Sequence, residues 1–128
     1  MQKIFITGGM GFIGSTLVKS CINRGYRVLN FDNLGFASCE KNVDIVARNT
    51  NYSFKCGDIR NREIVESIIF EFEPTAIIHL AAESHVDRSI DNPLSFLNSN
   101  IIGTYNLIEV VRKYLKNKDC KNFRLIHI

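Results

Sequence analysis

The stretch KIFITGGMGFIG, residues 3–14, decides the fold. It opens with a short apolar run from Ile4 to Thr7, which predicts a buried β-strand. A turn rich in glycine follows, and from Phe12 onward the apolar residues recur at the spacing of an amphipathic helix. A strand, a glycine turn and a helix in this order predict the start of a βαβ unit.

The glycines of this turn have the spacing G-x-x-G-x-x-G, and each has a predicted role. Gly8 permits a tight turn, Gly11 lets the backbone approach a pyrophosphate, and Gly14 lets the helix pack closely on the strand. The helix N-terminus then offers unpaired N–H groups and a positive dipole end to the phosphates. The spacing alone is weak, but its place between a predicted strand and a predicted helix favours a dinucleotide site over a glycine turn without a ligand.

Asp32 ends the second predicted strand, 18 positions after Gly14. An acid at this position accepts hydrogen bonds from the ribose hydroxyls of adenosine. It would repel a 2′-phosphate, and no Arg or Lys stands in the next several positions to reverse that effect. These residues predict NAD rather than NADP, and the alternative is an ordinary surface aspartate. Asp58 follows the third predicted strand, where an adenine edge could lie.

The remainder of the chain alternates strands with helices, which predicts a parallel sheet. Asn61 caps a helix that Pro74 ends, and Asn92-Pro93 begins a long helix. The shorter of these helices has a predicted apolar face of Ile64, Val65, Ile68, Ile69 and Phe72, and the long one of Leu97, Ile101, Thr104, Ile108, Val111 and Leu115. We expect an α/β, Rossmann-type, doubly wound sheet of five strands in the order 3-2-1-4-5, forming one domain over residues 1–128.

Composition limits the possible partners and compartments. The net charge of +3 and pI of about 8.7 are too mild to indicate nucleic-acid binding, and the late cations are expected to be a solvated helix end. The cysteines form no C-x-x-C pair, so no metal site is predicted and reduced thiols in a cytoplasmic protein are the simplest account. No signal peptide or membrane span is predicted. The cysteines are Cys21, Cys39, Cys56 and Cys120, and the late cations are Arg112, Lys113, Lys116, Lys118, Lys121 and Arg124.

Four further stretches carry a resemblance to a known family. They are GDIR at 57–60, HLAAESHVDRSI at 79–90, residues 100–109, and residues 123–128. Together with the glycine loop they resemble the extended short-chain dehydrogenase/reductases, an NAD-dependent epimerase/dehydratase family. Within it the likeness is to nucleotide-sugar dehydratases of the dTDP-glucose 4,6-dehydratase type. It covers essentially the whole chain but only the N-terminal part of a full enzyme.

The resemblance assigns cofactor contacts residue by residue. Ser99 stands where the family usually has Thr, and Gly35 and Ser38 where it usually has Thr and Gly, so an altered ribose loop is expected. The sugar nucleotide is expected near Ser84 and His85, the latter because ligands bind beyond the carboxyl ends of parallel strands. The expected NAD contacts are Gly8, Gly11, Phe12, Ile13 and Gly14 at the pyrophosphate, Asp32, Asn33, Leu34 and Gly35 at the ribose, Asp58 and Ile59 at the adenine, and Leu80, Ala81, Ala82, Glu83, Ser84 and Ser99 toward the nicotinamide.

The family's catalytic groups are expected to be missing from this chain. The resemblance implies hydride transfer from the sugar to NAD, loss of water and return of the hydride. It places a Tyr and a Lys on a later helix and an Asp-Glu pair just beyond the fifth strand. Tyr114 and Lys118 have the Tyr-x-x-x-Lys spacing, but they end a helix that returns to the amino edge of the sheet, away from the cofactor. We expect a sheet truncated after its fifth strand, an incomplete domain, and His79 as a buried core residue.

Several functions remain open from the sequence. The leading expectation is the NAD-binding part of a dTDP-glucose 4,6-dehydratase-like enzyme, inactive alone, which takes a dTDP-glucose-like sugar nucleotide only with a second half. The alternatives are one half of a split enzyme, a non-catalytic NAD-binding or sensing module, and a related nucleotide-sugar epimerase or dehydratase. Self-association is expected through the exposed edge of the fifth strand or through the long helix, which resembles one that helps form the family's dimer.

Overall fold

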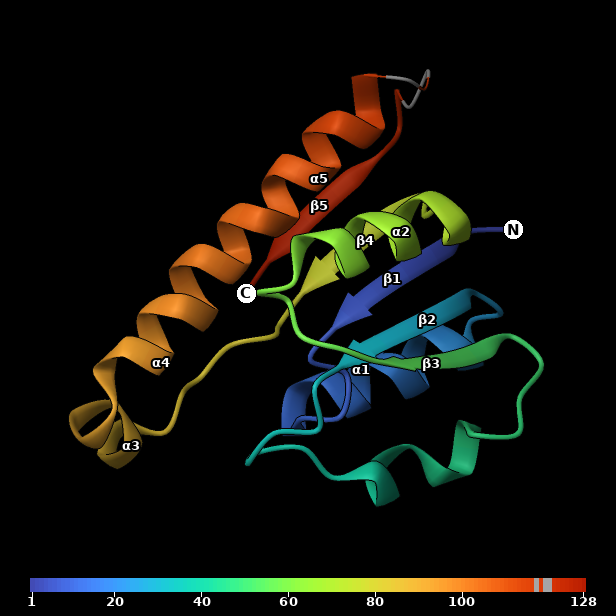
Figure 1. The fold of residues 1–128 in the computed structure, drawn as a ribbon. Helices are drawn as coiled ribbons and strands as arrows, with labels where there is room; N and C mark the ends of the chain where they lie inside the picture. The colour runs from blue at the N-terminus through green and yellow to red at the C-terminus, as the bar shows by residue number, and fades with distance from the viewer. Residues whose placement is uncertain (117, 119–120) are drawn as a thin grey trace.

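The computed structural model describes residues 1–116, 118 and 121–128. Its centre is a parallel five-stranded sheet in the order β3-β2-β1-β4-β5, which confirms the predicted fold class (Figure 1). The strands are β1 (Lys3–Thr7), β2 (Arg27–Asp32), β3 (Tyr52–Cys56), β4 (Ala76–His79) and β5 (Arg124–His127). The helices are α1 (Phe12–Asn23), the 3₁₀ helix η1 (Glu40–Val46), α2 (Arg62–Phe72), α3 (Val86–Asp91), α4 (Pro93–Leu97), the π-helical η2 (Asn98–Gly103) and α5 (Thr104–Lys116).

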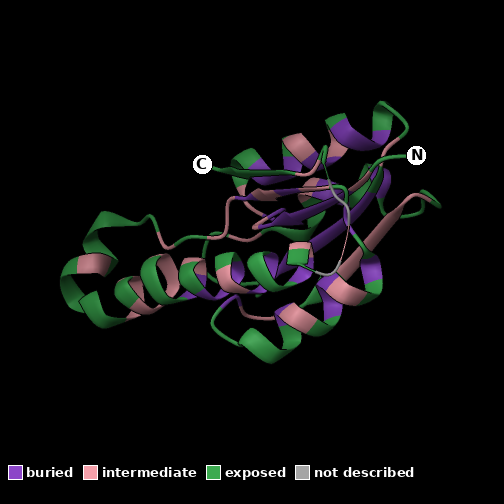
Figure 2. Ribbon diagram, turned by 90° about the horizontal axis from the view of Figure 1, so that it is seen from above, coloured by how far each residue is buried: buried purple, intermediate pink, exposed green. Residues whose placement is uncertain are grey.

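Both faces of the sheet are covered, so the central strands are apolar on both sides. Phe5 of β1 packs with α2 and α5 on one face, while its neighbours Ile4 and Ile6 pack with α1 and η1 on the other. Figure 2 shows the resulting concentration of buried residues on the strands and on the inner sides of the helices. Because all strands are parallel, their carboxyl ends meet at one edge, and the loops that follow β1 to β4 gather there.

The first helix ends where the sequence predicts. Gly25 follows it with φ of 79°, a conformation that glycine adopts without strain. Its amide donates to the carbonyl of Ile22, and the amide of Tyr26 donates to the carbonyl of Cys21. These two bonds form a Schellman cap and return the chain toward β2.

The long helix predicted after Pro93 is corrected in two respects. It is interrupted by η2, and the predicted stripe is only partly correct: Val111 and Leu115 lie on the core side, but Leu97, Ile101 and Ile108 are exposed. The buried face of α5 instead includes Leu107 and Val110. A π-turn holds more residues than an α-turn, so it changes which residues of the following helix face the sheet. The short helix α3, which buries no residue, was not predicted.

Several features outside the sheet were predicted from composition. Late cations form surface pairs, with Lys113 bonded to Glu66 and Lys118 to Glu73, as expected of a solvated helix end. Within the described residues, no helix has the length and apolar character needed to cross a membrane. Cys21, Cys39 and Cys56 are free thiols, and Cys120 lies outside the described residues.

Helix α2 offers a matched test of the core assignment. Ile64 was predicted on its apolar face, but the structure leaves it 40% exposed while Ile69 is 0% exposed. Ile69→Ala is expected to lower the free energy of unfolding by about 2–4 kcal/mol, because it removes buried methyl groups and leaves a cavity. Ile64→Ala is expected to cost about 1 kcal/mol or less, since more than a third of that residue is already exposed to water in the folded chain. Urea unfolding of both variants measures the difference, and equal losses would contradict this assignment.

Candidate cofactor site

In the loop after β1, the packing of the chain requires glycine at positions 8 and 14 but not at position 11. Gly8 has φ of 75°, and a Cβ placed on it would lie 2.7 Å from the amide nitrogen of Ala81. A Cβ on Gly14 would lie 2.1 Å from the carbonyl oxygen of Gly8, so the helix packs against the turn itself. A Cβ on Gly11 would meet only that same oxygen at 3.4 Å, an ordinary contact. Nothing within the chain therefore demands glycine at position 11.

Helix α1 begins without a side-chain cap. In the described part of the chain no side chain accepts from its first amides, and its first turn carries no acid. By contrast, Asn61 caps α2 and Asn92 caps α4 through their side-chain oxygens. The first turn of α1 is also open, because Phe12 is 89% exposed. Uncapped amides at the positive end of a helix dipole can bind an anion.

Asp32, at the carboxyl end of β2, organises the loop that follows. The carboxylate is 5% exposed and accepts three hydrogen bonds. Its Oδ2 accepts from the amide of Met10 at 2.9 Å, and its Oδ1 from the amide of Leu34 at 2.9 Å and the hydroxyl of Ser38 at 2.6 Å. The side chain thus ties the predicted ribose loop, including Asn33 and Gly35, to the glycine loop.

Asp58 and Ile59 follow β3, but their side chains face different surroundings. The Asp58 carboxylate accepts from the Arg60 guanidinium, with Nη2 to Oδ2 at 2.6 Å, and this hydrogen bond lowers the pKa of Asp58. Ile59 is buried in the core, against Gly103 at the end of η2. The amide side chain of Asn106 donates to the carbonyl of Arg60 at 2.9 Å, so α5 holds this loop in place.

The segment from Leu80 to Ser84 follows β4 and lies against the glycine loop. The amide of Leu80 donates to the carbonyl of Thr7 at 3.0 Å. Farther along, the side-chain oxygen of Asn100 in η2 accepts from the backbone amide of Glu83 at 2.8 Å. The side-chain nitrogen of Asn100 donates to the carbonyl of Glu83 at 2.9 Å. Ser99, the preceding residue of η2, is half-buried. Asn100 was not predicted as a site residue, although a helical Asn beside the predicted contact Ser99 was a usable signal.

A buried hydrogen-bond chain lies beneath this edge of the sheet. The hydroxyl of Thr7 accepts from the amide of Ala81 at 3.2 Å and is hydrogen-bonded to Nδ1 of His79 at 2.6 Å. On the other side of the ring, Nε2 is hydrogen-bonded to the hydroxyl of Thr104 at 2.9 Å. Burial and the neighbouring His127, which stacks on the ring, lower the pKa of His79 to about 4. The predicted core role of His79 is confirmed.

The predicted sugar-nucleotide residues, Ser84 and His85, lie on the exposed rim after β4. The imidazole of His85 packs edge-on against Phe36 of the ribose loop, with ring centroids 5.4 Å apart. The guanidinium of Arg88 lies over the same phenyl ring at 4.6 Å. The loops after β2 and β4 therefore contact each other across the carboxyl edge of the sheet.

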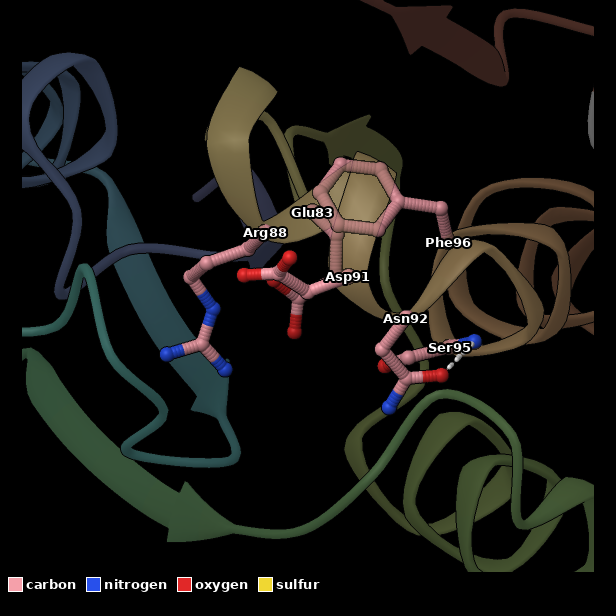
Figure 3. Close-up of a pocket in the computed structure, with 6 residues that line it drawn as sticks. All are labelled: Glu83, Arg88, Asp91, Asn92, Ser95 and Phe96. Atoms are coloured by element: carbon pink, nitrogen blue, oxygen red, sulfur yellow. Dashed lines mark hydrogen bonds between the residues drawn. The ribbon is translucent and has the colours of Figure 1, made fainter.

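A cavity of about 220 Å³ lies beside this rim, between the segment after β4 and helices α3 and α4 (Figure 3). Only Glu83 among the predicted site residues lines it, together with Arg88, Asp91, Asn92, Ser95 and Phe96. Its volume falls below the range of typical cofactor pockets. Apart from Glu83, the predicted dinucleotide residues therefore lie outside this cavity.

Tyr114 is far from that edge, as predicted. Its side chain is buried, and its hydroxyl donates to the carbonyl of Pro74 at 3.2 Å, just before β4 begins. This places it at the amino ends of the strands, opposite the predicted cofactor residues. The Tyr-x-x-x-Lys spacing of Tyr114 and Lys118 is therefore unrelated to the carboxyl edge.

Comparison with known proteins agrees with this arrangement. Residues 5–128 match the family described as GDP-mannose 4,6 dehydratase. The chain belongs to this family. Its resemblance to the N-terminal part of nucleotide-sugar dehydratases, expected from the sequence, is confirmed.

Individual relatives of the family show how much of a full-length protein is matched. The chain is 44% identical over 131 residues to the dTDP-glucose 4,6-dehydratase of Salmonella typhimurium, which covers 99% of this chain and 36% of that protein. It thus spans little more than a third of that relative's length. The structure of DesIV (dTDP-glucose 4,6-dehydratase) from Streptomyces venezuelae, with NAD and TYD bound, matches with a TM-score of 0.81 at 33% identity, over 88% of this chain and 36% of that one. UDP-glucose 4-epimerase from Thermotoga maritima, with UDP-glucose, matches with a TM-score of 0.81 at 35% identity, over 97% of this chain and 37% of that one.

The buried imidazole predicts a pH dependence of stability. His79 has a pKa of about 4 in the folded chain and about 6.5 in the unfolded chain, so folding favours the neutral ring. Its contribution of about 3 kcal/mol is fully present above pH 6.5 and is lost progressively as the pH falls to about 4. His79→Gln is expected to be less stable at pH 7 but to lose less stability over that interval. Urea unfolding at successive pH values measures both slopes, and parallel slopes would refute the assignment.

Proposed function

We propose that this chain is the NAD-binding domain of a nucleotide-sugar dehydratase of the dTDP-glucose 4,6-dehydratase type. The dinucleotide lies along the carboxyl edge of the sheet, with its pyrophosphate at the N-terminus of α1. Its adenosine lies toward β2 and β3, and its nicotinamide lies toward the segment after β4. The sugar nucleotide binds beside Ser84 and His85. The residues of this domain bind and orient, while the family's proton-transfer groups lie outside residues 1–128.

The observation that carries the proposal is the position of Gly11 at the uncapped start of α1. Its backbone has φ of −74° and ψ of 176°, which any residue adopts, and a Cβ there would clash with nothing in the chain. The fold therefore does not explain this glycine, whereas a diphosphate approaching the amides of Phe12 and Ile13 would. The absence of an acid from the first turn supports an anionic ligand.

The surroundings of Asp32 support NAD rather than NADP. Asp32 ends β2, and its carboxylate offers about four acceptor positions. The hydrogen bonds from Met10, Leu34 and Ser38 occupy three of them, which leaves one for a ribose hydroxyl. A 2′-phosphate there would face this buried negative charge, and residues 33–39 bring no cation. The NAD present in the DesIV structure agrees with this choice.

The proposal assigns no turnover to the chain alone. Hydride transfer to NAD and loss of water from the sugar need a proton-transfer group within hydrogen-bond reach of the substrate. Tyr114 is at the opposite edge, and its hydroxyl is bonded to Pro74. The 44% identity to the dTDP-glucose 4,6-dehydratase of Salmonella typhimurium supports the dehydratase. The two solved structures do not separate the alternatives, because DesIV at 33% and the epimerase at 35% identity have the same TM-score. Formation of a 4-keto sugar by the purified chain would refute this part of the proposal.

Substitution of Gly11 tests the carrying observation. Gly11→Ala is expected to change the free energy of unfolding by about 1 kcal/mol or less, because the added methyl group makes only an ordinary contact, with the carbonyl oxygen of Gly8 at 3.4 Å. It is expected to weaken NAD binding by about tenfold or more, because the methyl group stands between the helix amides and the diphosphate. Calorimetric titration with NAD measures the effect, and Ser20→Ala, on the exposed face of α1, serves as the control. If the folded parent chain binds no NAD, the proposed function fails.

We propose further that the long helix pairs with a second copy of this chain. Figure 1 shows α4 extending beyond the sheet, away from the core that α5 covers. Its solvent-facing side continues along η2 and α5 as one apolar stripe. Exposed apolar residues scattered singly over a surface would not form such a contiguous patch. Two copies of one stripe can pair about a two-fold axis, because each presents the same surface to the other. The stripe consists of Leu94, Leu97, Ile101, Ile102, Tyr105 and Ile108.

Charge placed in this stripe is expected to separate the copies. The parent chain should sediment as a dimer at micromolar concentration, and Ile101→Asp with Ile108→Asp should sediment as a monomer, because two charges would be buried without partners. The exposed β5, whose Ile126 also faces solvent, offers a competing route of association. A double variant that still associates would support that route instead, and a monomeric parent would exclude both.

A further inference from the structure

We infer that Ser38 occupies one of the two positions through which Asp32 would otherwise bind the adenosine ribose, so that this chain holds only one ribose hydroxyl directly at that carboxylate. The inference rests on the proposed function, because it concerns how the same site treats its ligand. It makes Ser38 a residue that sets both the affinity for NAD and the selectivity between the 2′- and 3′-hydroxyls.

The inference follows from counting acceptors. Each carboxylate oxygen accepts about two hydrogen bonds. Oδ1 of Asp32 already accepts from the amide of Leu34 at 2.9 Å and from the hydroxyl of Ser38 at 2.6 Å, so it is saturated. Oδ2 accepts only from the amide of Met10, at 2.9 Å, and keeps one position. The vicinal hydroxyls of a ribose, which together need two acceptors, meet only one.

The loop around Ser38 holds its hydroxyl in this place. Its amide donates to the carbonyl of Gly35 at 3.0 Å, and the next residue, Cys39, donates to the carbonyl of Met10 at 2.9 Å. The loop is also attached on its other side, where Phe36 packs against His85 and Arg88. The distance of 2.6 Å is that of a charge-assisted O–H···O⁻ bond, which is stronger than a neutral one.

The other two hydrogen bonds to the Asp32 carboxylate come from backbone amides, so they cannot give way to a ribose hydroxyl. The amides of Met10 and Leu34 belong to the glycine loop and to the turn after β2, where Leu34 has a left-handed φ of 55°. Only the Ser38 bond to Asp32 comes from a side chain, so only it can be removed without rebuilding a loop.

The test uses NAD and NAD analogues lacking the 2′- or the 3′-hydroxyl of the adenosine ribose, titrated calorimetrically into the full chain. For the parent, we expect one deoxy analogue to bind like NAD and the other about tenfold more weakly, because only one hydroxyl reaches an acceptor. We expect Ser38→Ala to bind NAD about tenfold more tightly than the parent does. We expect both deoxy analogues to bind this variant more weakly than NAD binds it. Ser67→Ala, on the exposed side of α2, should behave as the parent.

The outcomes separate this inference from the proposed function. A parent that binds NAD but loses affinity equally for both analogues, or a folded Ser38→Ala variant that binds NAD no more tightly, would overturn the inference and leave the proposed function standing. The absence of NAD binding by both parent and variant would overturn both. Ser38→Gly removes the same hydroxyl, so it replaces Ser38→Ala if that variant does not fold, and agreement between the two excludes an effect of the added methyl group.

Discussion

The backbone of Gly8 lies directly against the backbone of Leu80 and Ala81, and the rest of the site depends on this contact. It occurs where β1 and β4 are neighbours, which is where the chain changes direction across the sheet. Strands on the two sides of this point send their connections to opposite faces, so their loops diverge and leave an opening above the strand ends. A side chain at Gly8 would push the ends of β1 and β4 apart, because its Cβ would lie 2.7 Å from the amide nitrogen of Ala81.

Beneath the same edge lies a hydrogen-bonded network of polar groups. Thr7, His79 and Thr104 form one hydrogen-bonded chain. This chain joins β1, β4 and the first residue of α5, while Asn100 joins η2 to Glu83. A site supported in this way keeps its geometry before a ligand arrives, which reduces the entropy lost on binding. The surface ion pairs of α5 lie elsewhere and contribute little.

Asp32 illustrates how one buried carboxylate can serve the fold and a ligand together. A charge removed from water must be compensated by hydrogen bonds, and Met10, Leu34 and Ser38 supply them. Each bond that stabilises the loop also uses an acceptor position that a ribose would need. The balance between a rigid loop and an available acceptor is therefore decided by single side chains such as Ser38, and related chains can differ in it without any change of fold.

The sequence by itself determined the strands, most helices, their order and the glycine turn, because these depend on patterns within about ten residues. The ends of α1 and the cap of α2 at Asn61 were predictable for the same reason. Only the tertiary structure decided which face of α5 is buried, since η2 shifts the helical register and Gly103 permits the approach of Ile59. It also decided that Ser38 meets Asp32 and that Phe36 meets His85, because the first contact depends on how the loop after β2 folds back and the second joins the loops after two different strands.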